Sequence, residues 1–195
     1  GNAGFAAAVA GVALGARTTI VVPQPTPQSV RDRITALGAE VAVFGSVWDE
    51  ANQEALRLCQ QPNTVYIPPF DHSTLWKGHA SMITEAVQQG LSKPDAVILS
   101  VGGGGLACGV LEGMHQHGWE SVPLITVETK GADAFAQSVK ANKLVTLEAI
   151  TSKATSLGAK RVTQKLMDWI KIHKIENIVV TDDEAEQACF NFALE

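Results

Sequence analysis

A short apolar strand that runs into four consecutive glycines, immediately before a helix, constrains this chain more than any other feature. The strand is expected over residues 96–101, the glycines are Gly102, Gly103, Gly104 and Gly105, and the helix follows from Leu106. Glycine tolerates positive φ and leaves no Cβ between the backbone amides and a ligand. The free amides and the dipole at a helix start favour an anion. The pattern therefore predicts a phosphate-binding turn, with a flexible turn without ligand as the alternative.

The glycines alone leave the kind of phosphate open. No Lys-Ser or Lys-Thr pair follows them, so the P-loop pattern fails. The spacing Gly102-x-Gly104-x-x-Ala107 does match the dinucleotide fingerprint, and Glu128 lies 24 residues beyond Gly104, where a ribose-binding acid belongs. An NAD-binding Rossmann domain therefore stays open at this point.

Strands and helices alternate along the whole chain, which predicts an α/β fold with mostly parallel sheets. The expected strands cover residues 18–22, 41–44, 64–67, 96–101, 124–128 and 177–180. The expected helices cover residues 5–14, 27–37, 48–60, 75–89, 106–115, 134–141, 160–173 and 182–195, and Thr181 with Glu184 predicts a capping box for the last one. We expect two α/β units, residues 1–69 and 70–195, and a chain that is incomplete at both ends.

Charge and composition exclude several classes of partner. The chain has 20 acidic and 15 basic residues, a formal charge of -5, and no run of one sign, which argues against nucleic acid. Its apolar stretches are far shorter than the roughly 20 residues of a membrane span. Three widely separated cysteines and the lack of a signal-like segment favour a reduced setting, so we expect a soluble, cytoplasmic protein.

Six short motifs occur in a characteristic order. They are Gly1-Asn2-Ala3-Gly4, Ile67-Pro68-Pro69-Phe70-Asp71, Trp76-x-Gly78-His79-Ala80-Ser81, the four glycines, Val127-Glu128-Thr129-x-Gly131-Ala132 and Ile150-Thr151-Ser152. Together they resemble the L-serine dehydratases and L-threonine deaminases, tryptophan-synthase-β-like enzymes that use pyridoxal 5'-phosphate (PLP). The resemblance runs over essentially all 195 residues and outweighs the NAD interpretation.

The resemblance implies two three-layer α/β domains with mostly parallel sheets. Residues 1–69 would be part of the small domain, and residues 70–195 part of the large PLP-binding domain. It also implies a cofactor site. Asn2 would donate a hydrogen bond to the ring oxygen of PLP, although a helix N-cap is an alternative role for this residue. The phosphate cup would consist of Gly102, Gly103, Gly104, Gly105 and Leu106, and Ser156 would lie against the cofactor ring.

A monovalent-cation site, with K⁺ as the expected ion, is also implied by the resemblance. Its ligands would be Glu128 and backbone oxygens at or near Gly102, Ala132, Leu157 and Ala159. Hard cations favour such oxygen ligands. A solvated glutamate at the end of a strand is the alternative interpretation of Glu128.

The activity implied for the full chain is β-elimination of L-serine, and of L-threonine, to pyruvate or 2-oxobutanoate and ammonia. The lysine that binds PLP is expected to precede Gly1, so no catalytic residue is assigned within these 195 residues. A noncatalytic fragment that binds PLP or phosphate, and a serine racemase-type activity, are the alternatives. The resemblance also predicts a homodimer.

Overall fold

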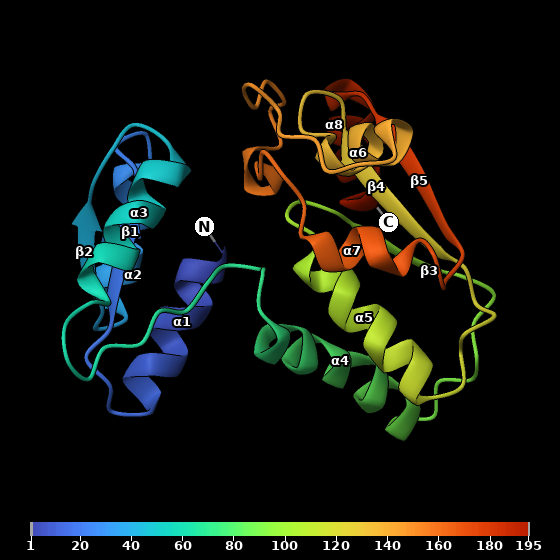
Figure 1. The fold of residues 1–195 in the computed structure, drawn as a ribbon, viewed down its shortest axis with the longest axis horizontal. Coiled ribbons are helices and arrows are strands. Elements are labelled where there is room, and N and C mark those ends of the chain that lie inside the picture. Colours follow the sequence, from blue (N-terminus) through green and yellow to red (C-terminus); the bar gives the residue numbers. More distant parts are fainter. Residues whose placement is uncertain (1, 195) are drawn as a thin grey trace. The chain divides into compact units, whose positions relative to one another are not determined.

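The computed structural model describes residues 2–194 and divides into two compact units, Gly1–Pro69 and Phe70–Glu195 (Figure 1). Gly1, which starts the first quoted motif, and Glu195, with which the last expected helix ends, lie outside the described residues. Each unit has its own parallel sheet and its own apolar core, so each is an α/β body by itself.

The first unit is built on a parallel pair of strands. Its elements are α1 (Asn2–Ala13), β1 (Thr19–Val22), α2 (Gln28–Ala36), β2 (Glu40–Val43) and α3 (Trp48–Leu58). Thr19 lies opposite Glu40 and Val22 opposite Val43. The core of this unit consists of the buried residues Ala8, Ile20, Val22, Ile34 and Ala39.

The second unit is larger and has a parallel sheet in the order β3-β4-β5. Its elements are α4 (Ser73–Gln88), β3 (Val97–Ser100), α5 (Gly105–Gln116), β4 (Leu124–Thr129), α6 (Ala134–Ala141), the 3₁₀ turn η1 (Thr155–Leu157), α7 (Gln164–Trp169), β5 (Ile175–Val180) and α8 (Asp182–Phe192). The central strand β4 is the most buried, and α5 lies beside both α4 and α7 (Figure 1). Parallel strands end at one edge of a sheet, so this edge collects the loops that follow them.

Helix α5 approaches α4 along a row of glycines that the sequence analysis did not recognise. Gly105, Gly109 and Gly113 are spaced four residues apart and therefore share one helix face. A Cβ at Gly109 would lie 2.4 Å from the Trp76 carbonyl oxygen, and one at Gly113 would lie 2.7 Å from the Ala80 carbonyl oxygen. The two helix backbones can come this close only because these positions carry no side chain.

The predicted α/β architecture with parallel sheets is confirmed, and so is the capping box of α8. Two expected elements are wrong. Residues 64–67 form no strand: no strand within residues 2–194 pairs with them, and Val65 is 81% exposed. The helix expected over residues 160–173 is shorter, since α7 runs only from Gln164 to Trp169. It begins after Thr163, whose hydroxyl accepts from the Lys165 amide as an N-cap and whose own amide donates to the Gly103 carbonyl.

No helix within residues 2–194 has the length and hydropathy needed to span a bilayer.

The glycine row of α5 can be tested by its effect on stability. Gly109→Ala should lower the free energy of unfolding by about 1–3 kcal/mol, because the new methyl group collides with the backbone of α4. Gly78→Ala is the matched control in α4, where a Cβ meets nothing within 4 Å. This control should stabilise the protein by about 0.5–1 kcal/mol through helix propensity. Urea denaturation measures both, and equal midpoints for the two variants would contradict the close approach.

Candidate functional site

The glycine loop turns the chain from the end of β3 into the start of α5. The Val101 amide donates to the Val127 carbonyl, Gly104 adopts φ +90°, and the Cys108 amide donates to the Gly104 carbonyl as the first hydrogen bond of the helix. L side chains rarely adopt the conformation of Gly104. Within residues 2–194 no backbone acceptor receives the amides of Gly102, Gly103, Gly104 or Gly105. The loop therefore presents unpaired donors at the start of a helix.

Phe70 packs against the loop and explains why two of its residues are glycine. A Cβ at Gly103 would lie 2.4 Å from ring atoms of Phe70, and one at Gly105 would lie 2.5 Å from the Phe70 carbonyl oxygen. From the sequence, positive φ and the approach of a ligand were the expected reasons for these glycines. The structure adds a further reason, since the loop has no room for a side chain on the side of Phe70.

Three hydrogen bonds, two of them between segments far apart in the sequence, hold Phe70 and the loop in place. The Trp76 indole donates to the Phe70 carbonyl over 2.8 Å. The Thr163 hydroxyl donates to the Asp71 carboxylate over 2.6 Å, and the Thr163 amide donates to the Gly103 carbonyl over 2.9 Å. The roles of Asp71 and Thr163 were not predicted from the sequence. Their pairing spans 92 positions of the chain, and no local pattern marks it.

Glu128 is fully buried at the end of β4, with 0% of its surface exposed. One carboxylate oxygen accepts from the Phe135 amide over 2.8 Å. The other accepts from the Ala136 amide over 2.8 Å and from the Asn177 side chain over 3.1 Å. Burial raises the pKa of Glu128 above its ordinary value, although these hydrogen bonds oppose the shift. The alternative of a solvated strand-end glutamate is therefore wrong.

The position of Glu128 also argues against the dinucleotide interpretation. A ribose-binding acid must present its carboxylate to a ligand. Here both oxygens of Glu128 accept amides from the first turn of α6, so the side chain fixes the start of that helix. The acidic residue of the fingerprint match therefore binds the start of α6 within the protein, instead of facing a ribose.

The remaining predicted site residues are distributed over three places. The backbone of Leu157 lies against Gly102, where a Cβ would be 3.2 Å from the Leu157 carbonyl oxygen. That oxygen accepts from the Ala159 amide over 2.8 Å, and Ser156 is exposed on η1. Ala132 is buried and its amide donates to the carbonyl of Thr129. Asn2 is exposed in the first turn of α1, in the other unit.

Comparison with known proteins identifies relatives of the whole chain. A human serine dehydratase-like protein is 47% identical over 188 residues, which cover 96% of this chain and 57% of the relative. The bovine L-serine dehydratase/L-threonine deaminase is 46% identical over 194 residues, which cover 98% of this chain and 59% of the relative. The chain thus spans less than two thirds of the length of either relative.

A solved structure is similar in fold and in sequence. The L-serine ammonia-lyase of the fungus Rhizomucor miehei superposes with a TM-score of 0.88 and 35% identity, over 95% of this chain and 59% of that chain. The family model described as pyridoxal-phosphate dependent enzyme matches residues 1–195. Because this match covers the full length, the chain belongs to the family of pyridoxal-phosphate dependent enzymes.

Proposed function

We propose that the full-length protein containing this chain eliminates water from L-serine, and from L-threonine, to release ammonia with pyruvate or 2-oxobutanoate. One observation carries the proposal. A glycine loop with unpaired amides opens α5 in a chain of the PLP family that is similar to serine dehydratases. The predicted homodimer and cytoplasmic location belong to the same proposal.

The residues of the loop fit the phosphate of PLP. Collision with Phe70 excludes a side chain at Gly103 and Gly105, and the positive φ of Gly104 disfavours one there. The backbone amides therefore stay bare, and the helix dipole of α5 adds a favourable field for a dianion. We assign the phosphate to the amides of Gly102 to Leu106.

When bound, PLP supplies an electron sink that stabilises charge at the substrate α-carbon and so allows the β-hydroxyl to leave. The contribution of this chain is to bind and orient. The glycine loop would fix the phosphate end, and Ser156 would lie against the ring. Asn2 keeps its predicted role toward the ring oxygen. The PLP-binding lysine is expected outside residues 1–195, so the proposal assigns no proton transfer to a side chain of this chain.

A monovalent cation completes the proposal for Glu128. Its carboxylate is fully buried, and no Lys or Arg within residues 2–194 forms an ion pair with it. Burying an unpaired charge is costly. Three hydrogen bonds also occupy only part of the roughly four lone-pair sites of a carboxylate. K⁺ would balance this charge, with carbonyl ligands at or near Gly102, Ala132, Leu157 and Ala159.

The activity is tested with the purified full-length protein. After reconstitution with PLP, L-serine should yield pyruvate and ammonia in equal amounts, and L-threonine should yield 2-oxobutanoate. A coupled lactate dehydrogenase assay measures the keto acids. Bound PLP with D-serine as the main product would instead favour a racemase. Failure to bind PLP would favour a noncatalytic protein, and either result would overturn the proposal.

The phosphate assignment predicts the effect of one methyl group in the loop. Gly103→Ala should weaken PLP affinity by about tenfold, because overpacking against Phe70 displaces the loop at a cost of about 1–3 kcal/mol. Gly78→Ala adds the same atoms at an open position and should leave the affinity unchanged. Fluorescence titration of the apo-protein with PLP measures both. Equal affinities would contradict the assignment.

The cation proposal predicts that K⁺ stabilises the folded protein. An ion that binds only the native state stabilises it by RT ln(1 + [ion]/Kd), and this raises the melting temperature. Replacing tetramethylammonium chloride by KCl at equal ionic strength should therefore raise the melting temperature by a few degrees, and Glu128→Gln should abolish this difference. Calorimetry in the two salts makes the comparison. The same melting temperature in both salts would contradict a K⁺ site.

A further inference from the structure

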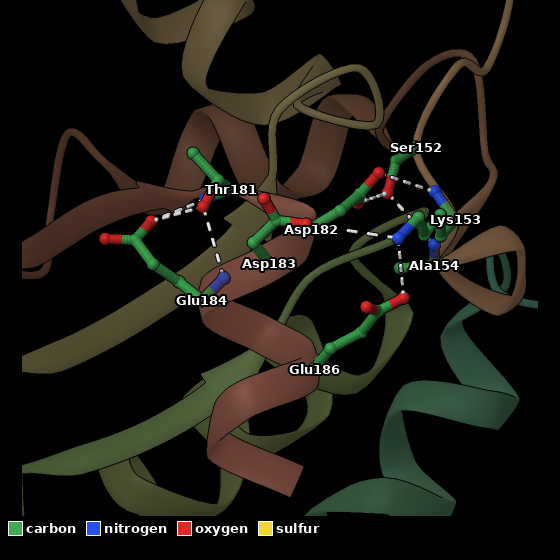
Figure 2. A network of polar contacts seen from close by, with 8 residues as sticks. All are labelled: Ser152, Lys153, Ala154, Thr181, Asp182, Asp183, Glu184 and Glu186. Carbon is green, nitrogen blue, oxygen red and sulfur yellow. Dashed lines mark hydrogen bonds and ion pairs between the residues drawn. The ribbon is translucent and has the colours of Figure 1, made fainter. Parts of the chain in front are cut away.

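Asp182, the first residue of α8, is hydrogen-bonded to the segment that precedes η1. One oxygen of its carboxylate accepts from the Ser152 hydroxyl over 2.6 Å, and the other accepts from the Lys153 amide over 2.9 Å. Figure 2 shows the Asp182 carboxylate directed toward these two residues, away from the capping box of Thr181 and Glu184. Asp182 therefore links the start of α8 to a segment 30 positions earlier.

The direction of the hydrogen bonds in this network follows from the chemistry of the carboxylate. The hydrogen bond from Ser152, followed by that from Lys153, holds the pKa of Asp182 below its ordinary value. An ionised carboxylate only accepts, so the Ser152 hydroxyl must donate to it. The Ser152 oxygen then accepts from the Thr129 hydroxyl over 2.7 Å and from the Ala154 amide over 3.0 Å. Ser152 is only 5% exposed, and this arrangement satisfies its hydrogen-bonding capacity.

The ion pairs of Lys153 hold the segment before η1 to α8 less firmly than the Asp182 hydrogen bonds do. The Lys153 ammonium lies 2.9 Å from Glu186 and 3.9 Å from Asp183, but all three side chains are largely exposed (Figure 2). Exposed ion pairs stabilise proteins little. The Thr129–Ser152–Asp182 chain of hydrogen bonds begins with two buried hydroxyls, that of Thr129 at the end of β4 and that of Ser152, so it holds the segment more firmly.

The segment that Asp182 holds, Ser152 to Ala154, leads directly to the glycine loop. It continues from Ala154 into η1, and the Cα of Leu157 on η1 would lie 3.3 Å from a Cβ at Gly102. The first glycine of the loop thus rests on backbone whose position depends on the Asp182 contacts. Ser156, assigned to the cofactor ring, lies on the same turn.

We propose that Asp182 is a positioning residue for the cofactor site, which sets η1 against Gly102 through its hydrogen bonds to Ser152 and Lys153. The inference rests on the proposed function for the identity of the ligand. It assigns Asp182 no contact with PLP. Its effect is to preorganise the backbone that meets the phosphate, and loss of preorganisation weakens binding.

The test uses the full-length protein and compares Asp182→Ala with Asp183→Ala. Both changes remove one carboxylate from the first turn of α8, but Asp183 is 95% exposed and only approaches Lys153 at 3.9 Å. Asp182→Ala should accelerate amide hydrogen exchange over residues 151–158 and weaken PLP affinity by roughly tenfold. Asp183→Ala should change neither. Asp182→Asn should keep most of the affinity, since its side-chain amide can accept from Lys153 and donate to Ser152 once the Ser152 hydroxyl turns to donate to Thr129 instead.

Each outcome decides for or against the inference. Faster exchange together with weaker PLP binding, specific to Asp182→Ala, supports it. Equal behaviour of the two alanine variants overturns it, even when the unmodified protein binds PLP and forms pyruvate. An unmodified protein that does not bind PLP overturns the proposed function, and with it the role of Asp182 toward the cofactor. If Asp182→Ala does not fold, Ser152→Ala takes its place against the same control.

Discussion

The close approach of Phe70 to the backbone of the glycine loop is the contact on which the rest of the second unit depends. It requires glycine at 103 and 105, and it brings Asp71 within hydrogen-bonding distance of Thr163. The Thr163 amide in turn binds the Gly103 carbonyl. The same close packing continues along α5, where further glycines admit the backbone of α4. A loop of four glycines is flexible in isolation, and these contacts make it a defined surface.

The polar groups that hold the elements around the candidate site lie at the carboxyl ends of the parallel strands. Glu128 at the end of β4 binds the first turn of α6, and Thr129 beside it starts the chain of hydroxyls that reaches Asp182. Glu128 and Thr129, the residues from which the two networks start, are both buried. A buried hydrogen bond cannot be exchanged for one to water, so each network fixes the element to which it is joined. The loop after β3 lies at the same edge of the sheet and is held by both Phe70 and Leu157.

Local patterns in the sequence predicted local features well. The glycine run correctly indicated a strand-to-helix turn, and the Thr181 and Glu184 pair formed the capping box that its spacing predicts. Residues 64–67 show where such reasoning fails. Their apolar, β-branched composition suits a strand, but a strand forms only beside a partner, and composition does not reveal whether a partner is present. The roles of Asp71, Thr163 and Asp182 were equally hidden, because each depends on a residue far away in the chain.

The sequence by itself determined the parallel α/β architecture, the glycine turn from a strand into a helix and the resemblance to PLP enzymes, since periodicity, glycine spacing and motif order are all properties of the linear chain. Only the tertiary structure decided what Glu128 does. Its spacing from the glycines suited a ribose ligand, the resemblance to the dehydratases implied a cation ligand, and a solvated side chain at the end of a strand was the alternative. Folding buried it completely and placed the amides of α6 around its carboxylate. Burial and hydrogen-bond partners arise from packing between distant segments, and they set the chemistry of an ionisable side chain.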